Sequence, residues 1–400
     1  MNRYIVIWQQ KDDFCMDTAT IRNTLIQNIE FLRSPEGYIR AGHPRFFKLF
    51  GRDSLIVAWQ LLDYDSSIAR NTLKALADIQ GTSTDAGREE EPGKILHEWW
   101  VDTTAKASGD KGGVPRQFPY YGSVDSTPLY LIVASLYFKK TGDIDFFETI
   151  RGSILSAIDW AVTYADTDND LFIDFQRKNP RGLYSQGWRD SASNQDESIE
   201  SPIELVEVQG YAYAAFTQIG DLLSHYGEGA LQKRLEERAE RLKEKFLKDF
   251  WWQEEKYFYF LLDAYHNPLR VVTSNPGHLL FTGILSQDGI RAVCERLFRE
   301  DMWTPYGIRT QSVLSEGFDV SAYQKGSIWP HDNWIIAQGL KRNGYDDLYK
   351  RVKDALLKIY NDAGTVPELC AVDYKNQLVP PRERNMMQAW SSGALLNMLL

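Results

Sequence analysis

Six acidic residues lie in or near clusters of Trp, Arg, Asn and Gln, and together they could do chemistry on a sugar: Asp53, Asp125, Asp190, Glu207, Asp332 and Glu368. A glycosidic bond breaks through an oxocarbenium-like transition state, which needs a proton on the leaving oxygen and a carboxylate that activates water or attacks. A helix N-terminus lowers the pKa of a carboxyl group placed there. We therefore expect Asp53, Asp125 and Asp332 to accept hydrogen bonds, while residue types alone leave the proton donor and the base unassigned.

The elements that position these acids are predicted to be helices. Apolar residues recur at i, i+3, i+4 and i+7 along most of the chain. This spacing predicts helices at about 17–33, 53–64, 66–80, 126–140, 143–164, 202–225, 228–250, 274–285, 287–299, 330–343, 345–362 and 386–399. Short turns join them in pairs, as expected for antiparallel helical hairpins. Residues 251–273 could form a small β-hairpin.

The polar-aromatic clusters lie at, or in the loops leading to, the starts of every second predicted helix. If six hairpins close into a ring, alternate helices line the inside and run in one direction. Their N-terminal ends then meet at one mouth. We therefore predict an all-α fold, an (α/α)6 toroid formed by residues 1–400 as a single catalytic domain. Its active-site funnel would lie at the N-terminal ends of the inner helices.

Composition narrows the ligand classes. The net charge of −10 argues against nucleic acid and against anionic membranes, because both require a basic surface. The 12 Trp and 21 Tyr offer flat faces on which a pyranose ring can stack. Three dispersed cysteines, an N-terminus unlike a signal peptide and the lack of an apolar run of about 20 residues favour a cytoplasmic protein. An oligosaccharide or glycan is the expected partner, and the oligomeric state stays open.

Several cofactor and metal motifs fail in detail. Gly87–Lys94 resembles a phosphate loop, but its glycines are one residue too far apart. His97-Glu98 lacks the second histidine of a zinc-protease helix. Asp166-Thr-Asp168-Asn-Asp170 begins like a calcium loop, but Leu171 and Arg177 replace the required Gly and Glu, so we expect a solvated turn. The sequence thus predicts no cofactor and no metal.

Longer sequence blocks show a family resemblance over almost the whole chain. They are GRDSLIVAWQLL (51–62), EEEPGKILHE (89–98), YYGSVDSTPLYLI (120–132), GLYSQGWRDS (182–191), VEVQGYAYAA (206–215), TSNPGHLL (273–280), GIRT (307–310), YQKGSIWPHDNWIIAQGL (323–340) and PELC (367–370). In this order they resemble the glycogen-debranching, or amylo-α-1,6-glucosidase, type of glycoside hydrolase. The barrel of that type is similar to those of processing α-glucosidase I, glucoamylase and trehalase.

The resemblance implies an inverting enzyme that releases a terminal α-linked glucose, including α-1,6 branch stubs. It makes Asp190 the general acid and Glu368 the general base. It implies a sugar pocket with Trp188 and Trp390 as stacking platforms, lined further by Arg52, Asp53, Asp125, Glu207, Gln209, Trp329, His331 and Asp332. We take His278 as a further candidate for substrate binding.

Three alternatives remain open. The same mechanism could serve an α-mannosidase or a hydrolase of glycosylated small solutes. His278 and His331 could instead carry protons in a sugar epimerase or isomerase. The acids could also hold hydroxyl groups in a non-catalytic glycan-binding protein.

Overall fold

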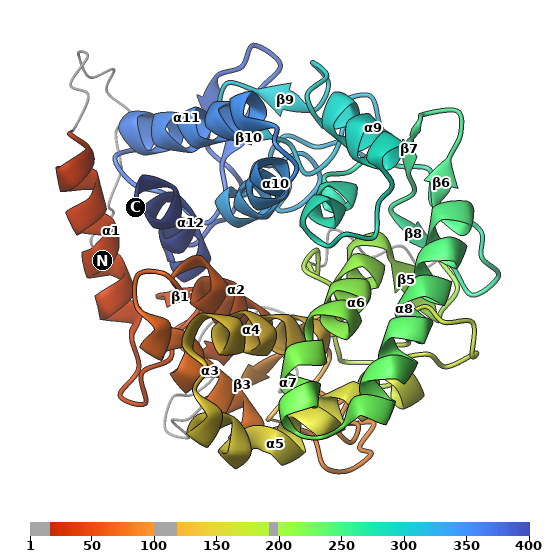
Figure 1. The fold of residues 1–400 in the computed structure, drawn as a ribbon. Helices are drawn as coiled ribbons and strands as arrows, with labels where there is room; N and C mark the ends of the chain where they lie inside the picture. Colours follow the sequence, from red (N-terminus) through yellow and green to blue (C-terminus); the bar gives the residue numbers. More distant parts are fainter. Residues whose placement is uncertain (1–16, 100–117, 192–198) are drawn as a thin grey trace.

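The computed structural model describes residues 17–99, 118–191 and 199–400, and this part of the chain is mostly helical. Successive inner segments contact one another, and the last contacts the first, so that they close a ring (Figure 1). The inner segments are α2 (Gly51–Gln60), α4 (Ser126–Thr141), α6 (Val206–Gln218), η3 (Asn275–Phe281), α10 (Pro330–Arg342) and α12 (Ala389–Leu399).

An outer layer of helices packs against this ring. It comprises α1 (Thr18–Leu32), α3 (Ser66–Asp78), α5 (Ile144–Asp159) with its π-helical extension η1 (Trp160–Tyr164), α7 (Gly220–His225), α8 (Gly229–Asp249), α9 (Gln287–Leu297) and α11 (Asp346–Ala363). Burial follows the layers. In α4 residues 126–135 are all buried, whereas α8 buries only the stripe Leu235, Ala239, Leu242 and Phe246. A helix buried on all sides belongs inside, and one with a single apolar stripe belongs outside.

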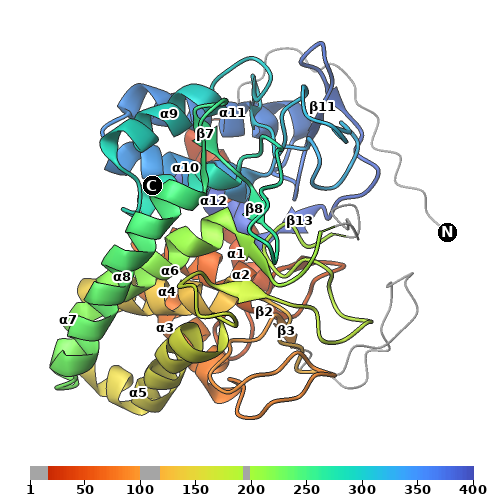
Figure 2. The ribbon, with the colours of Figure 1, turned by 90° about the vertical axis from the view of Figure 1, so that its right-hand side faces the viewer.

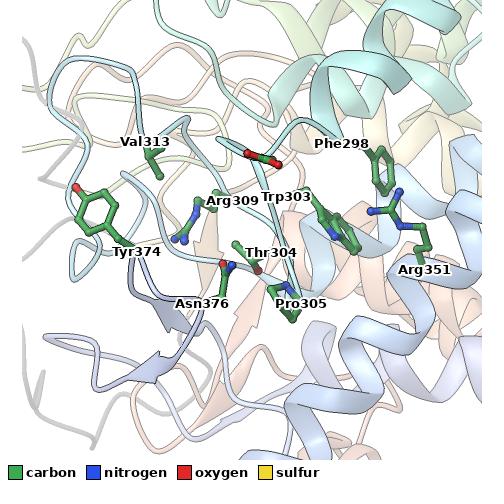
Figure 3. A pocket seen from close by; sticks show the side chains of 10 residues that line it. Phe298, Trp303, Thr304, Pro305, Arg309, Val313, Arg351, Tyr374 and Asn376 are labelled. Atoms are coloured by element: carbon green, nitrogen blue, oxygen red, sulfur yellow. The ribbon is translucent and has the colours of Figure 1, made fainter.

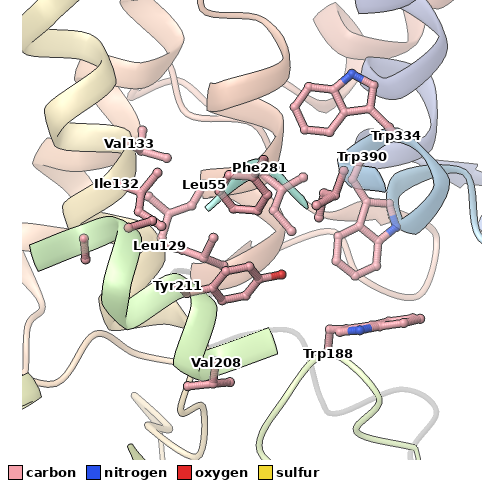
Figure 4. Packing of buried hydrophobic residues seen from close by; sticks show 14 of the residues in the cluster. Leu55, Leu129, Ile132, Val133, Trp188, Val208, Tyr211, Phe281, Trp334 and Trp390 are labelled. Carbon is pink, nitrogen blue, oxygen red and sulfur yellow. The ribbon is translucent and has the colours of Figure 1, made fainter. Parts of the chain in front are cut away.

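The interior of the ring is a continuous apolar core. Figure 4 shows Leu129 of α4 close to Tyr211 of α6, with Phe281 of η3 nearby. Close approach requires small residues at some contacts. A Cβ atom on Gly339 of α10 would lie 2.8 Å from the backbone of Leu280 next to it, so only glycine fits there.

Short antiparallel strands link the long loops on one side of the ring (Figure 2). They pair as β1 (Gly42–His43) with β13 (Met387–Gln388), β2 (Leu49–Phe50) with β3 (Glu98–Trp99), β6 (Trp251–Trp252) with β7 (Tyr257–Phe258), β9 (Trp303–Thr304) with β10 (Gly307–Ile308), and β11 (Ala371–Val372) with β12 (Leu378–Val379). A three-stranded sheet has the order β4 (Asp174–Phe175), β5 (Ile203–Leu205), β8 (Leu261–Leu262).

Most predicted elements occur within a few residues of their expected ends. The segment predicted as a helix at 274–285 is the shorter 3-10 helix η3, which has Pro276 in its first turn. The hairpin expected within 251–273 is present as β6 and β7. Among the described helices, none combines the length and the apolar character that a membrane span requires.

Candidate active site

The predicted site residues of the inner segments lie in or beside their first turns. Arg52 and Asp53 begin α2, Glu207 begins α6, and Asp125 is the N-cap residue of α4. His278 lies in η3, His331 and Asp332 begin α10, and Trp390 begins α12. Residues more than 300 positions apart in the sequence therefore surround one end of the ring.

Arg52 joins two of the predicted acids. Its Nε donates to Asp125 Oδ2 at 2.6 Å, and its Nη1 donates to Asp190 Oδ2 at 3.0 Å. A third bond runs from Nη2 to the Gln186 carbonyl at 3.3 Å. The guanidinium is buried, and the negative charges of Asp125 and Asp190 outweigh its desolvation, so its pKa is raised. Arg52 thus fixes the position of Asp190.

The loop that carries Asp190 is also anchored from the opposite side. The neighbouring Arg189 turns away from Asp190 and donates to the Gln324 carbonyl at 2.6 Å and to Gln311 Oε1 at 3.2 Å. Gln324 in turn donates from Nε2 to the Trp188 carbonyl at 2.7 Å. Arg189 and Gln324 were not predicted as site residues, and only the long-range pairing identifies them as anchors.

Glu368 is buried and held at both carboxylate oxygens. The Tyr323 hydroxyl donates to Oε1 at 2.5 Å, and the Asn385 backbone N–H donates to Oε2 at 2.6 Å. Burial raises the pKa of Glu368 to about 7, against the lowering effect of these two hydrogen bonds. A carboxyl group with this pKa exchanges a proton near neutral pH, which suits an acid or a base.

The charges of Asp190 and Glu368 raise the pKa values of the same two neighbouring residues. The pKa of Asp53 is raised to about 7, mainly by burial, and the charges of Asp190 and Glu368 both contribute to the increase. The same two charges also raise the pKa of the buried Tyr323 hydroxyl. Asp190 and Glu368 therefore both lie near Asp53 and Tyr323. Asp53 accepts a hydrogen bond, from Gln388, as expected at a helix N-terminus, although burial raises its pKa.

A second group of buried polar residues lies between α6, η3 and α10. The Asn275 amide donates to Glu207 Oε1 at 2.9 Å, and burial raises the pKa of Glu207 to about 7. His278 lies between the Tyr211 hydroxyl, 2.6 Å from Nδ1, and Asp332 Oδ1, 2.8 Å from Nε2. Glu207 Oε2 and Asp332 Oδ2 are buried without a hydrogen-bond partner among the described residues. Such oxygens are suited to accept bonds from sugar hydroxyls.

Several aromatic side chains lie beside these polar groups at the same end of the helical ring. The Trp390 ring stacks on His331, with centroids 3.7 Å apart and planes 9° apart. Trp188 meets Trp329 and His331 edge-on, at 5.9 and 5.0 Å, and stacks on His278 at 5.9 Å. Figure 4 shows Trp188 and Trp390 close to one another. Burial lowers the pKa of His331, so its imidazole is neutral at neutral pH.

Gln209 does not lie among the pocket groups. Its Oε1 accepts from the Ile173 N–H at 2.8 Å, and its Nε2 donates to the carbonyls of Ile173 and Leu205 at 2.7 and 3.1 Å. These bonds occupy the amide and connect α6 to the segment before β4. The prediction that Gln209 contacts a sugar is therefore not supported, because its side chain is committed to the backbone.

The sequence prediction missed three residues that hold the acids, namely Tyr323, Asn385 and Gln388. Gln388 Nε2 donates to Asp53 Oδ2 at 3.2 Å, and its Oε1 accepts from Asn385 Nδ2 at 2.9 Å. Tyr323 begins one of the quoted sequence blocks, and Gln388 immediately precedes α12. The available signals were the place of Tyr323 in that block and the closeness of Gln388 to Trp390.

The hollow shown in Figure 3, of about 620 Å³, is a separate feature. Its lining residues, which include Phe298, Trp303, Arg309, Arg351 and Tyr374, contain none of the predicted site residues. Both arginines that line this hollow already interact with neighbouring residues. The Arg351 guanidinium lies 4.7 Å from the Trp303 ring, and Arg309 donates to the Val372 and Asp373 carbonyls at 2.6 and 3.1 Å.

A ring of helices with paired carboxylates at one end is the arrangement expected of a glycoside hydrolase, and sequence comparison defines the class. The family model described as "Mannosylglycerate hydrolase MGH1-like glycoside hydrolase domain" matches residues 95–369, well over half of the chain. The chain belongs to this glycoside hydrolase family. The predicted membership of a glycoside hydrolase class is thus confirmed, whereas the debranching and glucosidase I types are not specifically supported.

Individual relatives carry the same name. Mannosylglycerate hydrolase from Rubrobacter radiotolerans is 22% identical over 301 residues, which are 73% of this chain and 64% of the relative. Mannosylglycerate hydrolase MGH1 from Selaginella moellendorffii is 31% identical over 91 residues, 23% of this chain and 19% of the relative. The matches thus span less than two thirds of these curated relatives.

Solved structures support the fold. The GH63 mannosylglycerate hydrolase from Thermus thermophilus, in complex with glucose, superposes with a TM-score of 0.75 at 17% identity. The match covers 94% of this chain and 99% of that one. The same enzyme in complex with Tris and D-glycerate gives a TM-score of 0.70 at 14% identity. These structures place the chain in a helical toroid class.

Proposed function

We propose that residues 1–400 form one catalytic domain that hydrolyses the α-glycoside of a small polar solute, of the mannosylglycerate kind, with inversion at the anomeric carbon. Asp190 is the general acid and Glu368 the general base. The observation that carries this proposal is that both carboxylates are linked to the start of α2. Asp190 accepts from Arg52, and Glu368 is linked through Asn385 and Gln388 to the neighbouring Asp53.

The roles follow from exposure and anchoring. The Asp190 side chain is 22% exposed, whereas Asp53, Asp125, Glu207, Asp332 and Glu368 are all buried. The acid must reach the leaving oxygen, and the aglycone departs toward solvent, so the most exposed acid suits this role. The base must hold one water in a fixed orientation, and Glu368 is fixed at both oxygens.

The other groups fit binding of the terminal sugar. Glu207 and Asp332 offer buried oxygens to hydroxyl groups. Trp188 and Trp390 each stack one face on a histidine, so their opposite faces are the ones left for a pyranose. A small solute as the aglycone is supported by the family and by the names of the relatives in it. Terminal glucose, as in debranching, is the competing substrate.

The test is a substrate panel with the anomeric form of the released sugar followed by proton NMR. The panel contains α-mannosyl-D-glycerate, α-glucosyl-D-glycerate, maltose and isomaltose. We expect the glycerate glycosides to be cleaved fastest and the first product to be the β-anomer. Asp190→Asn and Glu368→Gln should each lower kcat by at least about 10³-fold, with Glu237→Gln on the exposed face of α8 as the control.

Release of the α-anomer would exclude inversion, and faster cleavage of maltose or isomaltose would restore the glucan hypothesis. Loss of activity in the control, or full activity in either carboxylate variant, would refute the assigned roles.

A further inference from the structure

The acidic segment around Asp168, which the sequence led us to expect as a solvated turn, is only partly so. Asp166 and Asp174 are buried, because the segment folds back against α8 and enters β4. Leu171 adopts a positive φ of 89°, the conformation for which glycine is normally required. The absence of glycine therefore did not prevent a tight loop.

The carboxylate missing from the end of this loop comes from another strand. Glu204 on β5 pairs directly opposite Asp174 on β4. One ligand atom each from Asp168, Asp170, Glu204 and His266 lies within 4.8 Å of the others. His266 Nε2 lies 3.3 Å from Asp170 Oδ2, 3.5 Å from Glu204 Oε1 and 3.9 Å from Asp168 Oδ2. These separations are close to those between adjacent ligands of one ion at about 2.0–2.6 Å.

An independent observation points to a ligand here. Glu204 is 3% exposed, and its Oε2 has no hydrogen-bond partner among the residues that the structure describes. Asp174 is 4% exposed, with Oδ1 in the same condition. Asp174 forms a second close group with Asp166 and Asp168. A buried carboxylate oxygen without a partner is unfavourable, and a cation is the group that relieves it.

The cations already present do not balance the acids. Arg238 Nη2 donates to Asp166 Oδ2 at 2.7 Å, and Lys245 Nζ lies 3.1 Å from Asp170 Oδ2. Within the described part of the chain, no such pairing reaches Glu204 Oε2 or Asp174 Oδ1.

We propose that Asp168, Asp170, Glu204 and His266 bind a divalent cation that prefers oxygen ligands, either Ca²⁺ or Mn²⁺. Carboxylates suit both ions, whereas the imidazole suits Mn²⁺ better than Ca²⁺. His266 therefore distinguishes the two ions.

The bound ion would tie together three separate stretches of chain. Asp168 and Asp170 precede β4, Glu204 lies in β5, and His266 follows β8. The ion would therefore link all three strands at one end of the sheet. The chain between β4 and β5 carries Asp190. The ion would thus fix both ends of the segment that presents Asp190.

The experiment uses the full chain after dialysis against a chelator. Thermal unfolding is followed as CaCl2, MnCl2 or MgCl2 is added at constant ionic strength, and bound Mn²⁺ is counted by electron paramagnetic resonance. We expect Ca²⁺ or Mn²⁺ to raise Tm by several degrees, with one ion bound per chain. Asp168→Asn and Glu204→Gln should abolish the increase, and Glu237→Gln should retain it. His266→Ala should weaken Mn²⁺ binding about tenfold if Mn²⁺ is the ion, and should leave Ca²⁺ binding almost unchanged if it is Ca²⁺.

A Tm that none of these cations changes, together with no bound Mn²⁺, would overturn the proposal. An equal increase in Glu204→Gln and in the wild type would do the same. Because Asp168 is exposed, Asp168→Asn should fold even if Glu204→Gln does not, and persistence of binding in Asp168→Asn would also count against the site.

Discussion

The buried carboxyl group of Glu207 should make the protein less stable as the pH rises. Its pKa is raised from 4.5 to about 7, mainly because the charged form is desolvated. Between these values the folded chain binds a proton that the unfolded chain releases, so stability falls as the pH increases through this window. At about 1.36 kcal/mol per pKa unit, the full effect above pH 7 is about 3 kcal/mol.

The substitution Glu207→Gln removes this cost and preserves the local geometry. The new amide oxygen can accept from Asn275 as Glu207 Oε1 does, and its NH2 group takes the position of the unpartnered Oε2. We expect the variant and the wild type to have similar free energies of unfolding at pH 4.5. At pH 8 the variant should be more stable by about 2–3 kcal/mol.

The assay is urea unfolding at pH 4.5, 6, 7 and 8, with the free energy difference taken at each pH. Glu237→Gln, at an exposed position of α8, is the matched control and should show no trend with pH. Because Glu207 is placed to accept a sugar hydroxyl, the variant should also lose at least about tenfold in kcat/KM. A free energy difference that does not change with pH, or a variant less stable than the wild type at pH 8, would refute the reasoning.

Three further outcomes are expected. Arg52→Met leaves the buried carboxylate of Asp125 without its cation and removes the anchor of Asp190. It should therefore cost about 3–5 kcal/mol in urea unfolding and lower kcat/KM by at least about 10²-fold. A mild effect on both would contradict the anchoring. Activity should fall as the pH drops below about 7, where Glu368 becomes protonated. Tyr323→Phe should move this acidic limb of the pH profile to higher pH, because the tyrosine hydrogen bond lowers the pKa of Glu368. A limb that does not move in the pH profile of kcat/KM would count against Glu368 as the base. Gln209→Leu leaves buried backbone groups without hydrogen-bond partners, so it should destabilise the fold by about 2–4 kcal/mol while KM stays near the wild-type value. A raised KM with unchanged stability would instead indicate that Gln209 contacts the substrate.

The predictions about local structure came from the spacing of apolar residues along the chain. Helix periods depend on backbone geometry, so the stripe Ile21, Leu25, Ile29 and Leu32 predicted α1 and its buried face without further information. The polar clusters at the starts of alternate helices likewise indicated one end of a ring. Regular local periodicity was sufficient for both conclusions.

Periodicity could not predict which residues far apart in the sequence form hydrogen bonds with one another. Arg52 meets Asp190 across 138 positions, and Tyr323 meets Glu368 across 45. Gln209 shares its helix turn with Glu207, yet it faces the backbone of another segment instead of the pocket. Which side chains meet depends on how the ring closes and on helix rotation within it. A glutamate of β5 could therefore supply the carboxylate that the loop around Asp168 lacks, an arrangement decided by tertiary packing alone.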